Sequence, residues 1–137
     1  MPKPPLPPEL VQFLQAPRPA IVGTVRPDGG PVTTATWYGW ERDLLLLSMR
    51  AGGLRARRLE NDPRLALTVL GDSWNDHVSL RGRVVTLRHD EELADIDRLS
   101  QRYWGKPFPD RDARFLTALV EIMGWHTFGN PGAHGFA

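Results

Sequence analysis

The stretch Trp37–Leu70, WYGWERDLLLLSMRAGGLRARRLENDPRLALTVL, contains a strand pattern, a glycine break, a short helical pattern and another strand pattern. The apolar run at 44–48 is typical of a buried strand, and Gly52 and Gly53 interrupt the pattern after it. The segment LRARRLEN that follows predicts a helix of about two turns. This helix has to end before Pro63, because the residue before a proline avoids the helical conformation.

Strand patterns continue upstream of this stretch. The segment RPDGGP at 26–31 predicts a tight hairpin turn between a strand at 18–25 and a second strand at 32–40. After a turn at ERD, the LLLLS run would add a third strand. We therefore expect these three strands to pair in sequence order as a meander.

The downstream half predicts a long strand at 77–89, in which the apolar residues change phase around Gly82, as a β-bulge or a sharp bend would require. Helices are expected at 9–16 and 90–104. The final segment at 114–129 is expected to be a strand, or a helix that leads into a strand. Six mostly sequential strands with short helices between them favour a mainly β fold. A small antiparallel barrel fits this order better than a sheet of βαβ units.

The composition excludes several classes of function. The chain of 137 residues is expected to form one domain, 1–137, with a proline-rich arm at 1–8 and a tail at 129–137. It has no cysteine, which excludes a thiol nucleophile and a disulfide framework and fits a cytoplasmic location. A net charge of +1 gives no field that would attract nucleic acid. The sequence also lacks a signal peptide and a long apolar run, so we expect no membrane association.

The arginines that surround the double glycine allow two interpretations. Arg55 and Arg58 are three residues apart and share a helix face near the N-terminus, where an anion is favoured. The glycines would let a ligand approach the backbone closely, as a phosphate site needs. Alternatively, Leu54 and Leu59 hold a surface helix whose arginines are simply solvated. The spacing alone leaves both interpretations open.

The same stretch resembles the cofactor-binding segment of the pyridoxamine 5′-phosphate oxidase-like superfamily of flavin and deazaflavin proteins. The matching features are, in order, Trp37-Tyr38, Ser48, the Gly-Gly loop, Arg55 and Asn61-Asp62-Pro63. The resemblance extends through AIVGTVRPDGGPVTTATWY, HVSLRGRVVTL and RYWGKPFP to cover roughly 9–128. It implies a split β-barrel of the FMN-binding type, six-stranded and antiparallel with a Greek-key order.

The resemblance also implies where a cofactor binds. Arg55 takes the position of the cation that contacts the cofactor phosphate, and Arg58 would be a second contact from the next turn. The expected cofactor-binding set is Thr33, Thr34, Thr36, Ser48, Met49, Arg50, Arg55, Arg57 and Arg58. In this set the threonines would lie along the tricyclic ring, although they are equally ordinary strand residues.

The segments TATWY, LRARRLENDP and RYWGKPF look most like the deazaflavin branch of this superfamily. The coenzyme F-420 carries a phospholactyl and oligoglutamate tail, whose negative charge suits a groove rich in arginine. FMN, with one phosphate, is the alternative. The chain ends in EIMGWHTFGNPGAHGFA instead of the arginine-rich segment with which true pyridoxamine-phosphate oxidases read their substrate, so vitamin B6 oxidation is disfavoured.

By this resemblance the protein is expected to be an oxidoreductase that transfers hydride from reduced F-420 to a small conjugated or cyclic acceptor. Five tryptophans could wall a pocket for such a planar molecule, and Trp74 and His77 are the residues we expect there. Trp74 could instead be a lid on the core. His77 and His126 are candidate proton donors or ordinary packed histidines, and no catalytic residue is identified. The histidine spacing does not fit a metal site.

Members of the superfamily build each site from two chains, so the resemblance implies a homodimer with the cofactor groove at its interface. Two alternatives to the F-420 reductase are kept. One is an FMN-dependent oxidoreductase of the same fold. The other is a protein that binds a cofactor or ligand without turnover, which the lack of an evident proton donor favours.

Overall fold

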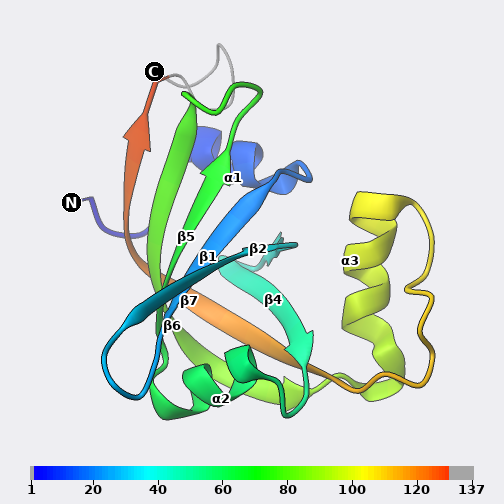
Figure 1. The fold of residues 1–137 in the computed structure, drawn as a ribbon. Helices are drawn as coiled ribbons and strands as arrows, with labels where there is room; N and C mark the ends of the chain where they lie inside the picture. Colours follow the sequence, from blue (N-terminus) through cyan, green and yellow to red (C-terminus); the bar gives the residue numbers. More distant parts are fainter. Residues whose placement is uncertain (1, 130–137) are drawn as a thin grey trace.

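Seven strands form one antiparallel sheet in residues 2–129, the part of the chain that this computed structural model describes (Figure 1). The strands are β1 (Ala20–Val25), β2 (Pro31–Thr36), β3 (Gly39–Glu41), β4 (Leu44–Arg50), β5 (Arg64–Leu70), β6 (His77–His89) and β7 (Phe115–Phe128). The helices are α1 (Pro8–Gln15), α2 (Leu54–Asn61) and α3 (Ala94–Trp104), with a short 3-10 turn, η1 (Glu91–Leu93), before α3.

The order of the strands shows why the sheet closes into a barrel. The order is β2-β1-β5-β6-β7-β4-β3, so β2 and β3 are its two edges. Only Trp37 and Tyr38 separate the end of β2 from the start of β3. Three residue steps reach at most about 11 Å, so the sheet has to curl until its edges approach. The expected mainly β antiparallel barrel is confirmed, with seven strands rather than six.

Two details of the strand prediction were wrong. The strand expected at 32–40 ends at Thr36, because Tyr38 turns inward, is fully buried and donates a hydrogen bond from its hydroxyl to the carbonyl of Ala16 at 2.9 Å. The expected meander is also interrupted: its two antiparallel pairings form, but the middle strand is divided into β2 and β3, which lie at opposite edges of the sheet. β2 pairs with β1, whereas β4 pairs with β3 and β7 on the other side of the sheet order.

The predicted irregularity in the long strand is present. The pairing of β6 with β7 shifts register between Arg81 and Gly82, and again between Val84 and Thr86. A Cβ atom at Gly82 would lie 2.5 Å from Cγ1 of Val120, so the backbones approach too closely for a side chain there. At the first shift the extra residue is Met123 of β7, and at the second it is Val85 of β6, so the change of phase expected around Gly82 occurs in β6 three residues later.

Helix α1 closes one end of the barrel. Its Leu10, Phe13 and Leu14 are almost completely buried and belong to the main core. That core also takes the inward residues of the strands, including Val22, Leu47, Leu67, Val69, Leu80 and Val120. Ala56 and Leu59 attach α2 to the same core. Helix α3 instead packs beside β4 with a second, smaller cluster of apolar residues.

The N-terminal end of α3 is fixed by two buried aspartates. Asp90 accepts hydrogen bonds from the backbone amides of Asp95 and Ile96, both at 2.8 Å, and so caps the helix. The helix expected at 90–104 therefore begins at Ala94, after Glu92 and Leu93 adopt positive φ angles.

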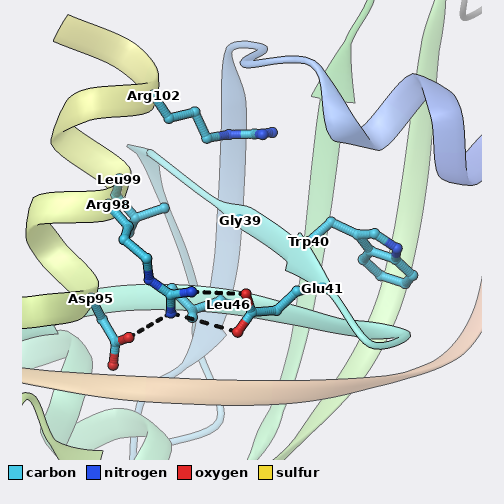
Figure 2. A pocket seen from close by; sticks show the side chains of 8 residues that line it. All are labelled: Gly39, Trp40, Glu41, Leu46, Asp95, Arg98, Leu99 and Arg102. Atoms are coloured by element: carbon cyan, nitrogen blue, oxygen red, sulfur yellow. Dashed lines mark hydrogen bonds and ion pairs between the residues drawn. The ribbon is translucent and has the colours of Figure 1, made fainter. Parts of the chain in front are cut away.

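Asp95 links α3 to the barrel by its side chain. Its carboxylate accepts hydrogen bonds from Thr117 at 2.7 Å, Arg98 at 2.6 Å and Arg88 at 3.3 Å. Arg98 in turn pairs with Glu41 on β3 at 2.8 Å, beside a cavity of about 150 Å³ (Figure 2). Burial alone would raise the pKa of Asp95, but these hydrogen bonds hold it below its ordinary value.

The lowered pKa of Asp95 gives a test of this anchor. Its stabilising contribution is present above the unfolded pKa of about 3.9 and is lost as the pH falls through the lower folded value. We expect Asp95→Asn to lower the free energy of unfolding by about 1–3 kcal/mol at pH 7. The variant should also lose less stability than the wild type between pH 5 and the acid limit.

Urea unfolding at a series of pH values measures both effects. Glu91→Gln, which removes an exposed carboxylate from the same segment, is the matched control and should follow the wild type. Equal acid slopes for Asp95→Asn and the wild type would contradict the role assigned to Asp95.

Candidate cofactor-binding site

A cleft of about 770 Å³ lies between α3 and the strands β1, β2 and β4. Its polar part consists of Thr36, Ser48 and Arg55, and its aromatic part of Trp37, Tyr103, Trp104 and Phe108. Pro17, Pro19, Ala20, Ile21 and Ala35 supply much of the opposite side.

Arg55 enters the cleft from the first turn of α2. Its Nη1 donates to the hydroxyl of Thr36 and its Nη2 to the hydroxyl of Thr34, both at 3.1 Å. Its Nε is buried and has no hydrogen-bond partner. Burial, together with the nearby charge of Arg58, lowers the pKa of Arg55. The fork is therefore fixed by two neutral hydroxyls and keeps one donor free.

The positive charge of Arg55 has no compensating carboxylate. Within residues 2–129, neither Arg55 nor its helix neighbours Arg57 and Arg58 form an ion pair. A desolvated, unpaired cation is costly, so an anionic ligand would be favoured beside it. The hydroxyl of Ser48, which lines the same cleft, is also buried without a partner. Both orphaned groups fit a phosphate or another anionic oxygen.

Four of the nine predicted cofactor residues thus meet at one place. Thr34, Thr36, Ser48 and Arg55 come together, although they lie on three different elements. Arg58 is half-buried on the same helix and close enough to affect Arg55 electrostatically. The spacing had left the phosphate site and the solvated helix open, and the burial of Arg55 favours the phosphate site.

The other four predicted residues are placed differently. The side chain of Met49 is buried in the core, because adjacent residues of a strand point to opposite sides and Ser48 faces the cleft. For the same reason Thr33 is exposed on the other face of β2 from Thr34. Arg50 is exposed at the end of β4, 3.8 Å from Asp110. Arg57 is exposed on α2. None of these four side chains lines the cleft.

The predicted substrate residues do not reach this cleft within one chain. Trp74 is 74% exposed in the loop between β5 and β6, and neither it nor His77 is among the lining residues. His77 contacts the carbonyl of Trp74 at 3.2 Å and stacks on Phe128 at 5.5 Å. Whether these residues act on a second chain stays a prediction.

The candidate proton donors are also absent from the lining. His126 is exposed on β7, and His134 lies outside the described residues. In the part of the chain that the structure describes, no aspartate, glutamate or histidine lines the cleft. Nor do residues 2–129 contain a cluster of side chains that could hold a metal ion. The lining therefore offers binding groups but no evident acid or base.

Two of the five tryptophans that could wall a pocket, Trp37 and Trp104, do line the cleft, whereas the sequence analysis missed Tyr103 and Phe108. The ring of Trp37 stacks on Tyr103 at 5.5 Å with an interplanar angle of 7°, and Trp104 meets it edge-on at 4.6 Å. Phe108 stacks on Trp104 at 6.3 Å. The aromatic residues of the segment RYWGKPF were a possible signal, but their meeting with Trp37 depends on how α3 packs. Such a wall favours a flat, apolar molecule.

Comparison with known proteins identifies the family of this chain. The family model described as pyridoxamine 5′-phosphate oxidase matches residues 6–127. The chain belongs to this family. Among curated proteins, none matches this chain. Within residues 2–129, no helix is both long and apolar enough to cross a membrane.

Solved structures with the split barrel of this family include proteins that bind different molecules. A protein described as F-420 reductase is 25% identical with a TM-score of 0.79, over 88% of this chain and 98% of the reductase. The heme storage protein HutZ from Vibrio cholerae is 18% identical with a TM-score of 0.65, over 90% of this chain and 95% of HutZ. An FMN-binding protein from Nostoc punctiforme is 17% identical with a TM-score of 0.56, over 77% of this chain and 70% of that protein.

The unpaired charge of Arg55 generates a prediction about this family member. Arg55→Ala should weaken the binding of its anionic cofactor by about 1.5–3 kcal/mol, the range of a charge-assisted hydrogen bond. The apo-protein should keep or gain stability, because the variant removes a desolvated charge without a partner. Isothermal titration with F-420 and FMN, and urea unfolding of the apo-protein, measure the two effects.

Arg57→Ala is the matched control for this variant, because it removes an exposed arginine from the same helix. With FMN, which has a single phosphate, it should change the affinity by a few tenths of a kcal/mol. If Arg55→Ala binds the cofactor as tightly as the wild type, the phosphate site is wrong and α2 is a solvated surface helix.

Proposed function

We propose that this protein binds the deazaflavin coenzyme F-420 in the cleft beside α3 and uses it to reduce a planar organic acceptor. The observation that carries the proposal is the half-buried guanidinium of Arg55, whose buried Nε has no hydrogen-bond partner and which has no carboxylate partner. Flavin-type cofactors bring an anionic phosphate and a flat ring, and the cleft combines a cationic end with an aromatic wall.

The residues of this chain would hold such a cofactor in distinct ways. Arg55 and Ser48 would bind its phosphate through their unpartnered donors. Thr34 and Thr36 would keep the arginine fork in place. The aromatic and proline side chains would exclude water from the ring. The reduced coenzyme, when bound, supplies a hydride, and this chain contributes binding, orientation and shielding.

Two observations favour F-420 over FMN. The F-420 reductase aligns over almost its entire length at the higher TM-score. In addition, Arg57 and Arg50 are exposed near the same end of the molecule as Arg55, where they could meet a long anionic tail. FMN, which has one phosphate, would use Arg55 but would leave these exposed arginines without a role.

A carrier or storage protein of the same fold is the second candidate. The cleft lining lacks an acid, and the heme storage protein HutZ has a similar fold. An enzyme with this lining has to take the proton of its product from water. The acceptor would therefore be one that is reduced without a proton from a protein side chain, such as a quinone.

We also propose a homodimer with the cleft at the interface. Ala35 and Ala66 are exposed on neighbouring faces of β2 and β5, and Ile21 of β1 lies beside Ala35 and is only partly covered. A face of small apolar side chains without covering helices is suited to pack on a second copy. Light scattering after size-exclusion chromatography would give the mass in solution, and a monomer at micromolar concentration would contradict this part of the proposal.

The experiment that tests the function is a titration followed by an acceptor screen. We expect apo-protein to bind F-420 more tightly than FMN, with salt weakening the preference, because part of the affinity is electrostatic. Reduced F-420 should then be oxidised faster with protein than without it in the presence of a quinone, an enone or a tetrapyrrole. Tight binding with no acceptor turned over would support the carrier, and preference for FMN would support a flavoenzyme.

The two tryptophans give a sharper prediction for the acceptor. Trp37→Ala should lower turnover of a planar acceptor by roughly tenfold, because one aromatic contact contributes about 1.5 kcal/mol. Trp74→Ala should leave turnover unchanged if one chain forms the whole acceptor site. Steady-state rates at saturating coenzyme measure both variants. A loss confined to Trp74→Ala would instead show that its loop serves the acceptor site of a neighbouring chain.

A further inference from the structure

The side chain of Arg102 leaves the last turn of α3 and ends at the C-terminus of α1. Its Nη1 donates to the carbonyl of Gln15 at 2.6 Å, and its Nη2 donates to those of Leu14 at 3.0 Å and Ala16 at 2.7 Å. The last carbonyls of a helix lack partners in the helix and form the negative end of its dipole. Since α1 has no basic residue in its own last turn, Arg102 caps it from another helix.

The same guanidinium lies among the aromatic rings behind the cleft. It is 5.0 Å from the ring centre of Tyr38 and 5.7 Å from that of Tyr103. The hydroxyl of Tyr38 donates to Ala16, and the hydroxyl of Tyr103 donates to the carbonyl of Arg18 at 2.8 Å. Arg102 and these two tyrosines therefore fix the segment 14–18 against α3 with five hydrogen bonds from three side chains.

The two parts that Arg102 connects, the segment after α1 and the last turn of α3, both contribute residues to the cleft. Pro17 and Pro19 of the fixed segment line one side of it, and Tyr103 carries the stacked ring of Trp37 on the other. Arg102 itself does not line the cleft and borders the small cavity beside Glu41 and Arg98 (Figure 2). It lies where it can set the separation of the two sides without touching a ligand.

We infer that Arg102 is a positioning residue for the cleft: by capping α1 it fixes the segment Pro17–Pro19 opposite the aromatic wall. This inference rests on the proposed function for its cofactor readout. Leu10, Phe13 and Leu14 keep α1 in the core independently of the cap. Loss of Arg102 should therefore misplace the cleft lining and leave the barrel folded.

The test compares Arg102→Met, Arg102→Lys and Arg98→Gln with the wild type. Isothermal titration with F-420 is carried out at a temperature at which circular dichroism shows all four proteins folded. Arg102→Met should weaken binding by roughly tenfold, as expected for misplaced site groups. Arg102→Lys should give an intermediate loss, because an ammonium keeps the charge but lacks the planar fork.

Arg98→Gln is the matched control. It removes a neighbouring arginine of α3 that pairs with Glu41 and Asp95 but does not contact α1. Its affinity should stay within about twofold of the wild type. Equal weakening by Arg98→Gln and Arg102→Met would overturn the inference, because any loss of helix anchoring would then suffice. So would an Arg102→Met affinity that matches the wild type.

Near-ultraviolet circular dichroism of the apo-proteins separates this inference from the proposed function. The stacked rings of Trp37 and Tyr103 should give a signal that Arg102→Met reduces, Arg102→Lys partly restores and Arg98→Gln leaves unchanged. If the wild type binds neither F-420 nor FMN, the proposed function fails, and this signal alone decides the role of Arg102. An unchanged spectrum in Arg102→Met would then overturn it.

Discussion

The two-residue connection between β2 and β3 is the constraint on which the rest of this structure depends. It joins the two edge strands of the sheet and so forces closure of the barrel. Tyr38 turns into the core, whereas Trp37 lies in the cleft. Thr36, just before them, holds Arg55. Closing the barrel and forming the polar and aromatic parts of the cleft are therefore consequences of the same short segment.

The charges of Asp95 and Arg55 differ in how completely their neighbours compensate for removal from water. The carboxylate of Asp95 receives hydrogen bonds from two arginines and a threonine, which compensate for its removal from water. The guanidinium of Arg55 donates hydrogen bonds to only two neutral hydroxyls, and its buried Nε has no partner. Incomplete compensation at a cleft is typical of a binding site.

The sequence predicted the features that depend on neighbouring residues. The helix at 54–61 follows from the glycines before it and the proline after it, and the irregular pairing of β6 follows from the change of phase in its sequence, although the extra residue is Val85 and not Gly82. Strand pairing depends on distant segments, so the separation of β2 from β4 could not be obtained from order alone. The resemblance placed Arg55, Thr34 and Thr36 in one site, and the structure brings these three together, but it also included Thr33, which is exposed on the other face of β2. It could not show that Met49 faces the core or that Trp37 meets Tyr103, because both depend on packing.

The chemistry of the cleft lining suits the binding step of both proposed functions. One buried cation, a few hydroxyls and an aromatic wall can hold an anionic planar molecule and keep water from its faces. None of these groups can deliver a proton at neutral pH as a carboxylic acid or an imidazolium would, and the hydroxyl of Tyr103 is engaged with Arg18. A reductase and a carrier would therefore use the same binding contacts. They differ in whether the cleft, once a cofactor is bound at Arg55, still admits a second planar molecule against the aromatic wall.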